Sequence, residues 1–209
     1  MTVFLDIETL DFFQDAHIKA LPRDQQLKAM RFGCAVTYND AADEWLEWQA
    51  HAIADLYVYL GYMPKAAITG WNIKDFDWPV ICNNAMIINS ALRSCSPELY
   101  DPFDLIRQKT GRWYSLETVA QHNLGRGKLA DGQKAAEWLR SGDADLVAKA
   151  LEYCRHDVQL TMDLAAILQR GEPLRLPPRA QRQELNEILI WNDGRTERIP
   201  DATGAISTK

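Results

Sequence analysis

The sequence has few cysteines and no long apolar run. Its four cysteines are scattered over 209 residues with no Cys-x-x-Cys pair. This pattern excludes a small disulfide scaffold and favours thiols in a reducing compartment. No apolar stretch approaches the roughly 20 residues that a membrane-spanning helix requires. The N-terminal MTVFLDIETL has no basic region before its apolar residues, so we expect no signal peptide, a cytoplasmic location and no membrane partner.

Basic residues are in the minority, with 23 against 29 acidic residues and a net charge of −6. An acid excess alone argues against a protein that binds nucleic acid through its overall charge. The charges are unevenly distributed, because residues 105–134 carry six basic side chains and two acidic ones. Both an ordinary solvated surface and a surface that contacts a nucleic-acid backbone fit this segment.

Hydrophobic residues make up 47% of the chain and charged residues 25%, which is ordinary globular usage. Hydrophobic periodicity predicts strands in the first part and helices in the second. The expected strands are 2–7, 31–38, 44–49 and 66–69, with a short strand or strand end within 99–105. The expected helices are 51–60, 76–89, 115–123, 132–140 and 143–169. This order predicts an α/β or α+β layered domain with a central mixed sheet.

The composition changes after residue 170, where GEPLRLPPRAQRQ is rich in proline and arginine. The following EILIWNDGRTERI predicts a hairpin around Asp193 and Gly194. We therefore divide the chain into a domain, 1–169, and a C-terminal extension of unknown role, 170–209. The extension can pack on the domain, bind a protein partner or lengthen a substrate groove.

Two acidic residues end the first predicted strand. Because side chains alternate along a strand, Asp6 and Glu8 lie on the same face. Adjacent carboxylates repel each other unless cations offset their charge, and oxygen ligands of this kind suit Mg²⁺ or Mn²⁺. A solvated strand end without any ligand also fits this pattern.

Two further acidic residues, Asp77 and Asp157, lie close in sequence to aromatic side chains. Asp77 lies in GWNIKDFDWPVI near the start of a predicted helix, where a carboxylate is also common as a capping group. Tyr153 and Asp157 are four residues apart on the long predicted helix, hence neighbours on one face. The pair fits a structural hydrogen bond, or a metal ligand beside a phenol that orients water.

In this order, FLDIET, GWNIKDFDWPVI and YCRHD resemble the three motifs of the DEDD 3′–5′ exonucleases. Tyr153 marks the DEDDy branch of that group. The middle motif is similar to the proofreading exonuclease domain of family-B DNA polymerases and to its stand-alone relatives. The resemblance covers residues 2–169 and implies an RNase H-like α/β fold, a central mixed β-sheet flanked by helices.

The resemblance also implies a site and an activity. The implied metal ligands hold two Mg²⁺ or Mn²⁺ ions and are Asp6, Glu8, Asp77 and Asp157. Tyr153 would orient the attacking water. The positions expected to hold terminal nucleotides are Leu10, Asn72 and Phe76, and the basic residues expected to contact the strand backbone are Arg112, Arg126 and Lys128.

The implied function is metal-dependent 3′–5′ hydrolysis of single-stranded DNA ends, with release of nucleoside 5′-monophosphates. RNA is a possible substrate, because an exoribonuclease resembling RNase D uses the same four acids. A non-catalytic RNase H-like module that binds a protein through the C-terminal extension is the alternative from a different class.

Overall fold

The computed structural model describes residues 1–61, 67–88, 96–127, 129, 132–179 and 186–200. Its contacts divide the chain into two compact units. The first unit comprises residues 1–101 and 128–161, and the second comprises residues 102–127 and 162–209. The domain boundary predicted at residue 170 stays a prediction.

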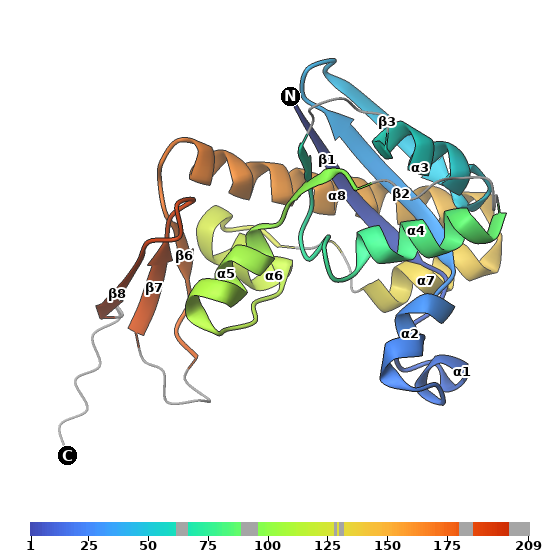
Figure 1. Ribbon diagram of the computed structural model, residues 1–209, viewed down its shortest axis with the longest axis horizontal. Helices are drawn as coiled ribbons and strands as arrows, with labels where there is room; N and C mark the ends of the chain where they lie inside the picture. The colour runs from blue at the N-terminus through green and yellow to red at the C-terminus, as the bar shows by residue number, and fades with distance from the viewer. Residues whose placement is uncertain (62–66, 89–95, 128, 130–131, 180–185, 201–209) are drawn as a thin grey trace. The chain divides into compact units, whose positions relative to one another are not determined.

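The first unit is built on a five-stranded mixed sheet in the order β3-β2-β1-β4-β5 (Figure 1). The central strand β1 pairs antiparallel with β2 and parallel with β4, while β3 and β5 complete the two edges. The strands are β1 (Thr2–Thr9), β2 (Phe32–Asn39), β3 (Glu44–Gln49), β4 (Ala67–Thr69) and β5 (Glu98–Tyr100). The predicted α/β fold with a central mixed sheet is therefore confirmed.

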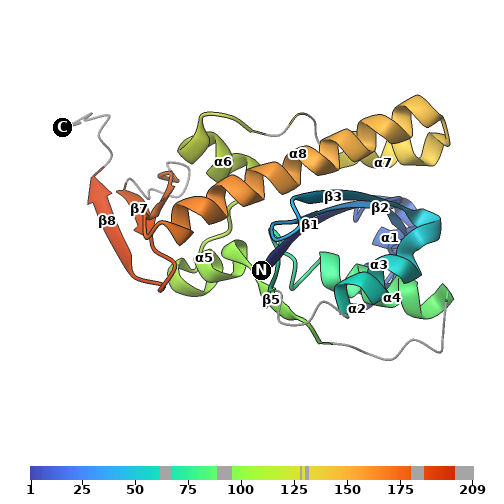
Figure 2. The same cartoon turned by 90° about the horizontal axis from the view of Figure 1, so that it is seen from above.

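Helices cover both faces of this sheet. Figure 2 shows α7 (Gly132–Ser141) and α8 (Ala144–Gln169) on one face, and α3 (Ile53–Gly61) and α4 (Asp77–Ile88) on the other. A short 3-10 helix, Ala50–Ala52, precedes α3. Helix α8 contributes its residues 144–161 to this unit.

Alternation along β1 assigns its two faces. Val3, Leu5 and Ile7 are buried in the main hydrophobic core, together with residues of α3 and α4. Because the side-chain period of a strand is two, Asp6 and Glu8 project to the opposite face. That face is covered by α7 and α8.

The first unit also contains elements that sequence periodicity did not predict. Between β1 and β2 lie two short helices, α1 (Ala16–Lys19) and α2 (Arg23–Ala29). Residue 66 of the predicted strand 66–69 and residue 89 of the predicted helix 76–89 lie outside the described residues, as does Cys95. The other cysteines, Cys34, Cys82 and Cys154, are thiols.

The structure refines one sequence prediction near the start of the second unit. The short strand or strand end expected within 99–105 is present only as the end of β5 at Tyr100, and the unpredicted helix α5 (Pro102–Thr110) follows. Proline is well tolerated at the first helical position, where its missing N–H has no intrahelical partner, so Pro102 can begin this helix. Helix α6 (Leu116–Leu124) comes next, with Ser115 as its N-cap.

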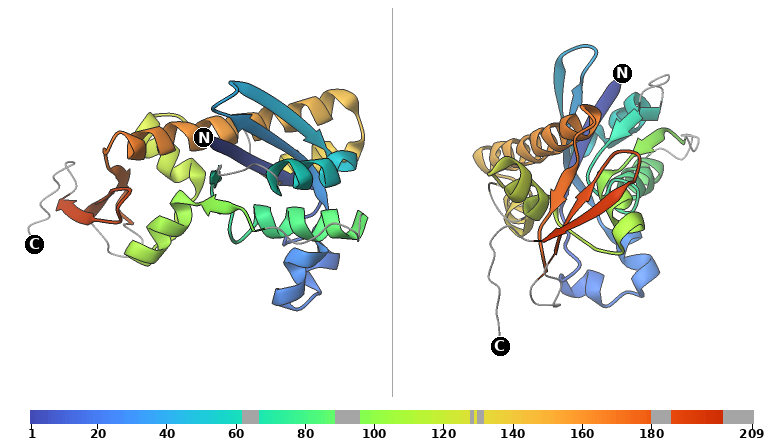
Figure 3. Two further views of the ribbon diagram at one scale, coloured as in Figure 1. Left: turned by 45° about the horizontal axis from the view of Figure 1, so that its top comes forward. Right: turned by 90° about the vertical axis from the view of Figure 1, so that its left-hand side faces the viewer.

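The described part of the C-terminal extension forms an antiparallel sheet in the order β6-β7-β8. Its strands are β6 (Leu174–Leu176), β7 (Asn186–Ile190) and β8 (Thr196–Pro200). The predicted hairpin is confirmed by the pairing of β7 with β8 (red in Figure 3) and by Gly194 at a φ of 80°. The Asn123 amide bonds both the N–H and the carbonyl of Arg175, each at 2.8 Å, and so joins α6 to β6.

No helix among the described ranges has the length and apolarity that a membrane span requires.

Candidate metal centre and adjoining pocket

Three carboxylates of the first unit converge, and we call Asp6, Glu8 and Asp157 the acid set. One ligand atom from each lies within 4.8 Å of the others. Asp6 and Glu8 are half-buried on β1, whereas Asp157 on α8 is fully buried. Carboxylates this close repel one another, and their oxygen atoms are the ligands that Mg²⁺ and Mn²⁺ prefer. The acid set therefore fits a divalent cation by its chemistry.

A hydrogen bond joins helix α8 to β1 next to the acid set. The Cys154 thiol donates a hydrogen bond to the backbone carbonyl of Asp6 at 3.1 Å. Burial raises the pKa of Cys154 well above its usual value, so the thiol stays a neutral donor. Tyr153 is 1% exposed and lies one helical turn before Asp157. The fold thus places this phenol on the same helix face as a buried member of the acid set.

Strand β2 approaches the acid set closely at a glycine. A Cβ on Gly33 would lie 2.9 Å from the carbonyl oxygen of Glu8 and 2.7 Å from Leu139 of α7. The register between β1 and β2 also shifts between Glu8 and Thr9. Such a bulge turns the side chains at the end of a strand, here beside the acid set.

Asp77, the fourth predicted ligand, bonds to the other edge of β1 and is not among the three converging carboxylates. Strand β4 pairs with Thr2–Phe4, so β1 continues beyond the end of this parallel pairing. There Asp77, which is 4% exposed at the start of α4, accepts the backbone N–H of Ile7 at 3.2 Å. This bond supplies an acceptor for a buried N–H that the ladder with β4 does not reach. It also ties Asp77 to the residue between Asp6 and Glu8.

The turn before α4 is held by Asp101. Its carboxylate accepts the backbone N–H of Asn72 at 3.0 Å and that of Lys74 at 3.2 Å. Asn72 has a φ of 64°, a left-handed conformation that asparagine tolerates better than most residues. Its side-chain Oδ1 is buried and accepts no hydrogen bond from the part of the chain that the structure describes. This acceptor suits a ligand that carries a donor.

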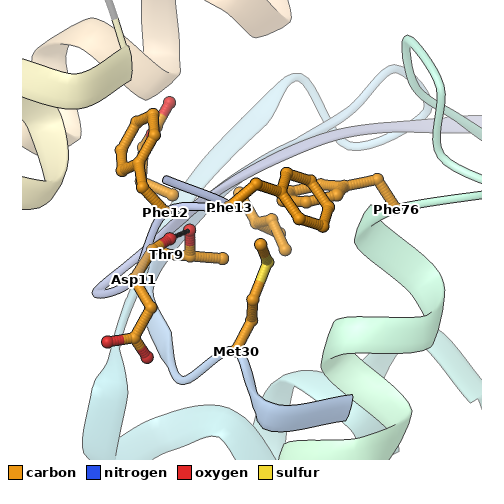
Figure 4. A pocket seen from close by; sticks show the side chains of 8 residues that line it. Thr9, Asp11, Phe12, Phe13, Met30 and Phe76 are labelled. Atoms are coloured by element: carbon orange, nitrogen blue, oxygen red, sulfur yellow. Dashed lines mark hydrogen bonds between the residues drawn. The ribbon is translucent and has the colours of Figure 1, made fainter. Parts of the chain in front are cut away.

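A pocket of about 120 Å³ adjoins the acid set (Figure 4). Figure 4 shows the Phe13 and Phe76 rings close together, with the Met30 side chain reaching toward them. The centroids of the two phenylalanine rings are 6.2 Å apart. The lining residues are Ile7, Glu8, Thr9, Asp11, Phe12, Phe13, Met30 and Phe76. The pocket is thus mainly apolar and shares Glu8 with the acid set.

The sequence analysis predicted a role for Phe76 but not for the other aromatic and apolar residues that line this pocket. Phe12, Phe13 and Met30 belong to the connection between β1 and β2, for which no element was predicted. The adjacent pair Phe12-Phe13, soon after an acidic strand end, is the only sequence signal for these residues. Leu10, also expected to hold a nucleotide, is not among the lining residues, and its N–H donates to the carbonyl of Arg31 at 2.9 Å.

The basic residues expected to contact a strand backbone belong to the second unit. Arg112 is only 7% exposed, and its guanidinium donates to the Tyr114 hydroxyl at 3.2 Å. Arg126 forms an ion pair with Asp163. Lys128 lies outside the described residues. Both described arginines thus make contacts inside their own unit, and a role in binding the strand stays a prediction.

A second group of ligand-type side chains lies close to the first along the chain. We call Asp11, Asp15 and His17 the Asp11 cluster, whose ligand atoms also lie within 4.8 Å of one another. The Arg31 guanidinium donates to both oxygens of Asp11, at 2.9 and 2.6 Å. Arg140 donates to Asp15 at 3.0 Å. Because arginines of the chain already balance these carboxylates, the Asp11 cluster does not fit a metal ion.

The strand order, the helices on both faces and the acids on the central strand define an RNase H-like fold. A family model described as the RNase H superfamily matches residues 3–169. The chain therefore belongs to the RNase H superfamily, which includes nucleases. A search of curated proteins finds no relative of this chain.

Proposed function

We propose that the protein is a metal-dependent 3′–5′ exonuclease that acts on single-stranded ends, prefers DNA and releases nucleoside 5′-monophosphates. The observation that carries this proposal is the convergence of the acid set beside a pocket that Glu8 and Phe76 line together. A phosphodiester held at the acid set would leave the terminal base within reach of an apolar, aromatic surface. This arrangement suits the removal of one nucleotide at a time.

The residues that would hold the two divalent cations are Asp6, Glu8 and Asp157, with Asp77 in support. When bound, such cations lower the pKa of water and stabilise negative charge on a phosphate undergoing hydrolysis. Asp77 is bound to β1 through the N–H of Ile7, the residue between Asp6 and Glu8, and this supports its proposed part in holding the cations. The chain thus supplies an oxygen-only set of ligands drawn from one strand and two helices.

Tyr153 would orient the attacking water. A phenol has a pKa of about 10, which makes it a poor base at neutral pH. Its hydroxyl can still accept and donate hydrogen bonds, and burial on α8 restricts where that hydroxyl points. We therefore assign Tyr153 the task of positioning water and not of removing its proton.

The pocket would hold the terminal base without reading its identity. Every base presents a flat π-face, so stacking on Phe76 tolerates any sequence. The described pocket wall is mainly apolar, and we expect hydrolysis of ends of any sequence. Binding by stacking also favours unpaired ends, because a paired base is already stacked in its duplex.

The test is a time course with 5′-labelled single-stranded DNA and RNA of one sequence, in Mg²⁺, Mn²⁺ or EDTA. We expect a metal-dependent ladder that shortens from the 3′ end, faster on DNA, and no ladder with Asp6→Asn. Glu187→Gln, a change of a buried carboxylate in the second unit, serves as the matched control and keeps the ladder. If neither polymer is cut with any metal, the proposal is wrong, and faster cleavage of RNA would make the protein an exoribonuclease.

A further inference from the structure

The connection between β1 and β2 is far longer than the geometry of the sheet needs. Antiparallel neighbours can be joined by a turn of two residues. Here residues 10–31 intervene and carry α1 and α2, and we call this segment the insert. The insert supplies Phe12, Phe13 and Met30 to the pocket. An insert of this length whose residues line a pocket requires a functional explanation.

The two ends of the insert are clamped together. Leu10 donates its backbone N–H to the carbonyl of Arg31 at 2.9 Å. Asp11 accepts the backbone N–H and the Nε of Arg31, each at 2.9 Å, and Nη2 at 2.6 Å. A bidentate pair of a carboxylate with a guanidinium is among the strongest and most directional contacts in proteins. The clamp therefore fixes where the insert leaves and rejoins the sheet.

Asp11 and its neighbours make further hydrogen bonds besides those with Arg31. It is 1% exposed, and His17 lies 3.1 Å from Oδ1. Thr9 donates its hydroxyl to the backbone carbonyl of Asp11 at 2.7 Å. The next N–H, that of Phe12, donates to Asp15 at 2.8 Å. The backbone is thus fixed on both sides of the peptide that leads to Phe13.

The Phe13 ring also has a stabilising contact with a cation. The Arg23 guanidinium lies 4.8 Å from the Phe13 ring centroid, a geometry in which the cation is attracted to the ring. Arg23 in turn donates to Gln26 at 3.1 Å within α2. Phe13 remains half-buried and lines the pocket beside Phe76, with the two ring centroids 6.2 Å apart and the ring planes tilted by 57°. Phe13 also packs against the main hydrophobic core, so its ring is fixed in place while part of it borders the pocket.

We propose that the insert is a recognition element in which Phe13, packed beside Phe76, contacts the terminal nucleobase, and Asp11 positions Phe13 by binding the insert to Arg31. This inference rests on the proposed exonuclease function. It assigns the ligand class of the insert as an unpaired terminal base. Asp11 is a positioning residue here, since it acts through the wall that it holds.

The test compares a substrate that contains nucleobases with one that contains none. One is a single-stranded DNA oligonucleotide, and the other is bis(p-nitrophenyl) phosphate, a phosphodiester without a nucleobase. Both are measured with Mn²⁺ on the full chain, and the readout is the ratio of their kcat/KM values. The variants are Phe13→Ala, Phe13→Leu and Asp11→Asn.

Stacking on one aromatic side chain accounts for a change of roughly 5- to 100-fold in binding. We expect Phe13→Ala to lower the ratio by this factor, mainly through a higher KM for the oligonucleotide. Phe13→Leu keeps the apolar bulk without the ring and lowers the ratio less. Asp11→Asn lowers it in the same direction, again through KM more than kcat.

The second unit provides a matched control for Asp11. Glu187 is 4% exposed, accepts two bonds from the Arg175 guanidinium and lies 2.5 Å from His122. Glu187→Gln thus removes the same type of buried, arginine-paired carboxylate, and it leaves the ratio as in the wild type. Thermal unfolding of each variant shows how much stability each change removes.

The outcomes separate the two proposals. If Phe13 and Asp11 variants change both substrates in parallel, as a loss of folded protein would, the recognition role of the insert is overturned while wild-type hydrolysis stands. If the wild type hydrolyses neither substrate with any metal, the proposed exonuclease is overturned and the inference falls with it. A lowered ratio in both Phe13→Ala and Asp11→Asn, with none in Glu187→Gln, supports the inference.

Discussion

The acid set and the Asp11 cluster lie near one end of β1 and satisfy the same distance criterion, yet they are built differently. In the Asp11 cluster the chain itself supplies the cations, since Arg31 donates to Asp11 through three nitrogen atoms and Arg140 donates to Asp15. In the acid set, Asp6 and Glu8 on a central strand meet Asp157 from a helix. The comparison teaches that close carboxylates alone do not define a metal site. Where arginines of the chain already bind the carboxylates, as in the Asp11 cluster, a metal ion does not fit.

A third group sharpens this comparison. Glu187 in the second unit has a guanidinium and an imidazole as neighbours, like Asp11 in the first. The Arg175 hydrogen bonds lower the pKa of Glu187 below its usual value. At Asp11, burial raises the carboxyl pKa, but hydrogen bonds from Arg31 outweigh this effect, so the pKa is lowered as well. Both carboxylates therefore act as ionised structural anchors.

The largest expected effect is the loss of hydrolysis when the acid set is broken. Metal ions contribute several kcal/mol to stabilising charge in the transition state, and each 1.36 kcal/mol is tenfold in rate, so Asp157→Asn is expected to cost roughly 10²- to 10⁴-fold in kcat/KM. The measurement is single-turnover hydrolysis of the oligonucleotide. Glu187→Gln stays near the wild-type rate. A fully active Asp157→Asn protein would show that the acid set is not the catalytic centre.

The second effect is stabilisation by metal binding. A ligand at 100 times its Kd adds about 2.7 kcal/mol to the free energy of unfolding, which raises Tm by roughly 5–10 °C in a chain of this size. We expect Mn²⁺ to produce this rise in the wild type and in Asp15→Asn, but not in Asp6→Asn. Differential scanning calorimetry with and without EDTA measures it. A rise abolished by Asp15→Asn would place the ion in the Asp11 cluster instead.

A Tyr153 variant can distinguish the binding of a cation from the catalysis that depends on it. Removing the hydroxyl in Tyr153→Phe keeps the buried ring but removes the group that positions water, and we expect kcat to fall about 10- to 100-fold. The Mn²⁺-induced rise in Tm persists, since the acid set is intact. Parallel measurement of kcat and of that rise tests this separation. A loss of both would make Tyr153 part of the structural support for the cation.

Asp77 has a structural role that can be separated from its role at the site. Asp77→Ala leaves the buried Ile7 N–H without its acceptor, and we expect a loss of about 1–3 kcal/mol in the free energy of unfolding. Asp77→Asn keeps an oxygen for this bond, so it retains most of that stability while losing the charge. Urea denaturation measures the difference. Equal stability of the two variants would show that the bond contributes little.

The smallest effect is the pH dependence at Glu187. Since the pKa of this carboxyl is lower in the folded protein, its stabilising contribution is fully present above the ordinary value near 4.5 and is lost as pH falls below it. The wild type should therefore lose its stability advantage over Glu187→Gln as the pH falls from neutral to below that ordinary value. Urea denaturation across this range measures the advantage. An advantage that is constant with pH would mean that ionisation of Glu187 contributes nothing to stability.

Much of the first unit could be predicted from local pattern. Alternation and apolar runs located β1, β2 and β3, and the spacing of apolar residues located the long helix α8. In the second unit, turn chemistry located the hairpin at Asp193 and Gly194. These signals are local, because a strand, a helix or a tight turn leaves its own period within a few neighbouring residues.

The insert and its pocket could not be predicted in the same way. Helices α1 and α2 are too short to leave a periodic signal, and α5 begins within a segment for which only a strand or strand end was predicted. The wall formed by Phe13 and Met30 depends on the pairing of Asp11 with Arg31, twenty residues further along the chain. Contacts over such separations have no fixed sequence pattern, so their partners cannot be read from spacing.

By itself, the sequence determined the strands β1, β2 and β3, the long helix α8 and the common face of Asp6 and Glu8. It also provided the three motifs that name the candidate residues. Only the tertiary structure decided that Asp157 meets those two acids, that Asp77 binds the Ile7 N–H and that Arg31 balances Asp11. The physical reason is that periodicity assigns a side chain to a face. The charges and hydrogen-bond partners that meet it there come from segments far away in the chain.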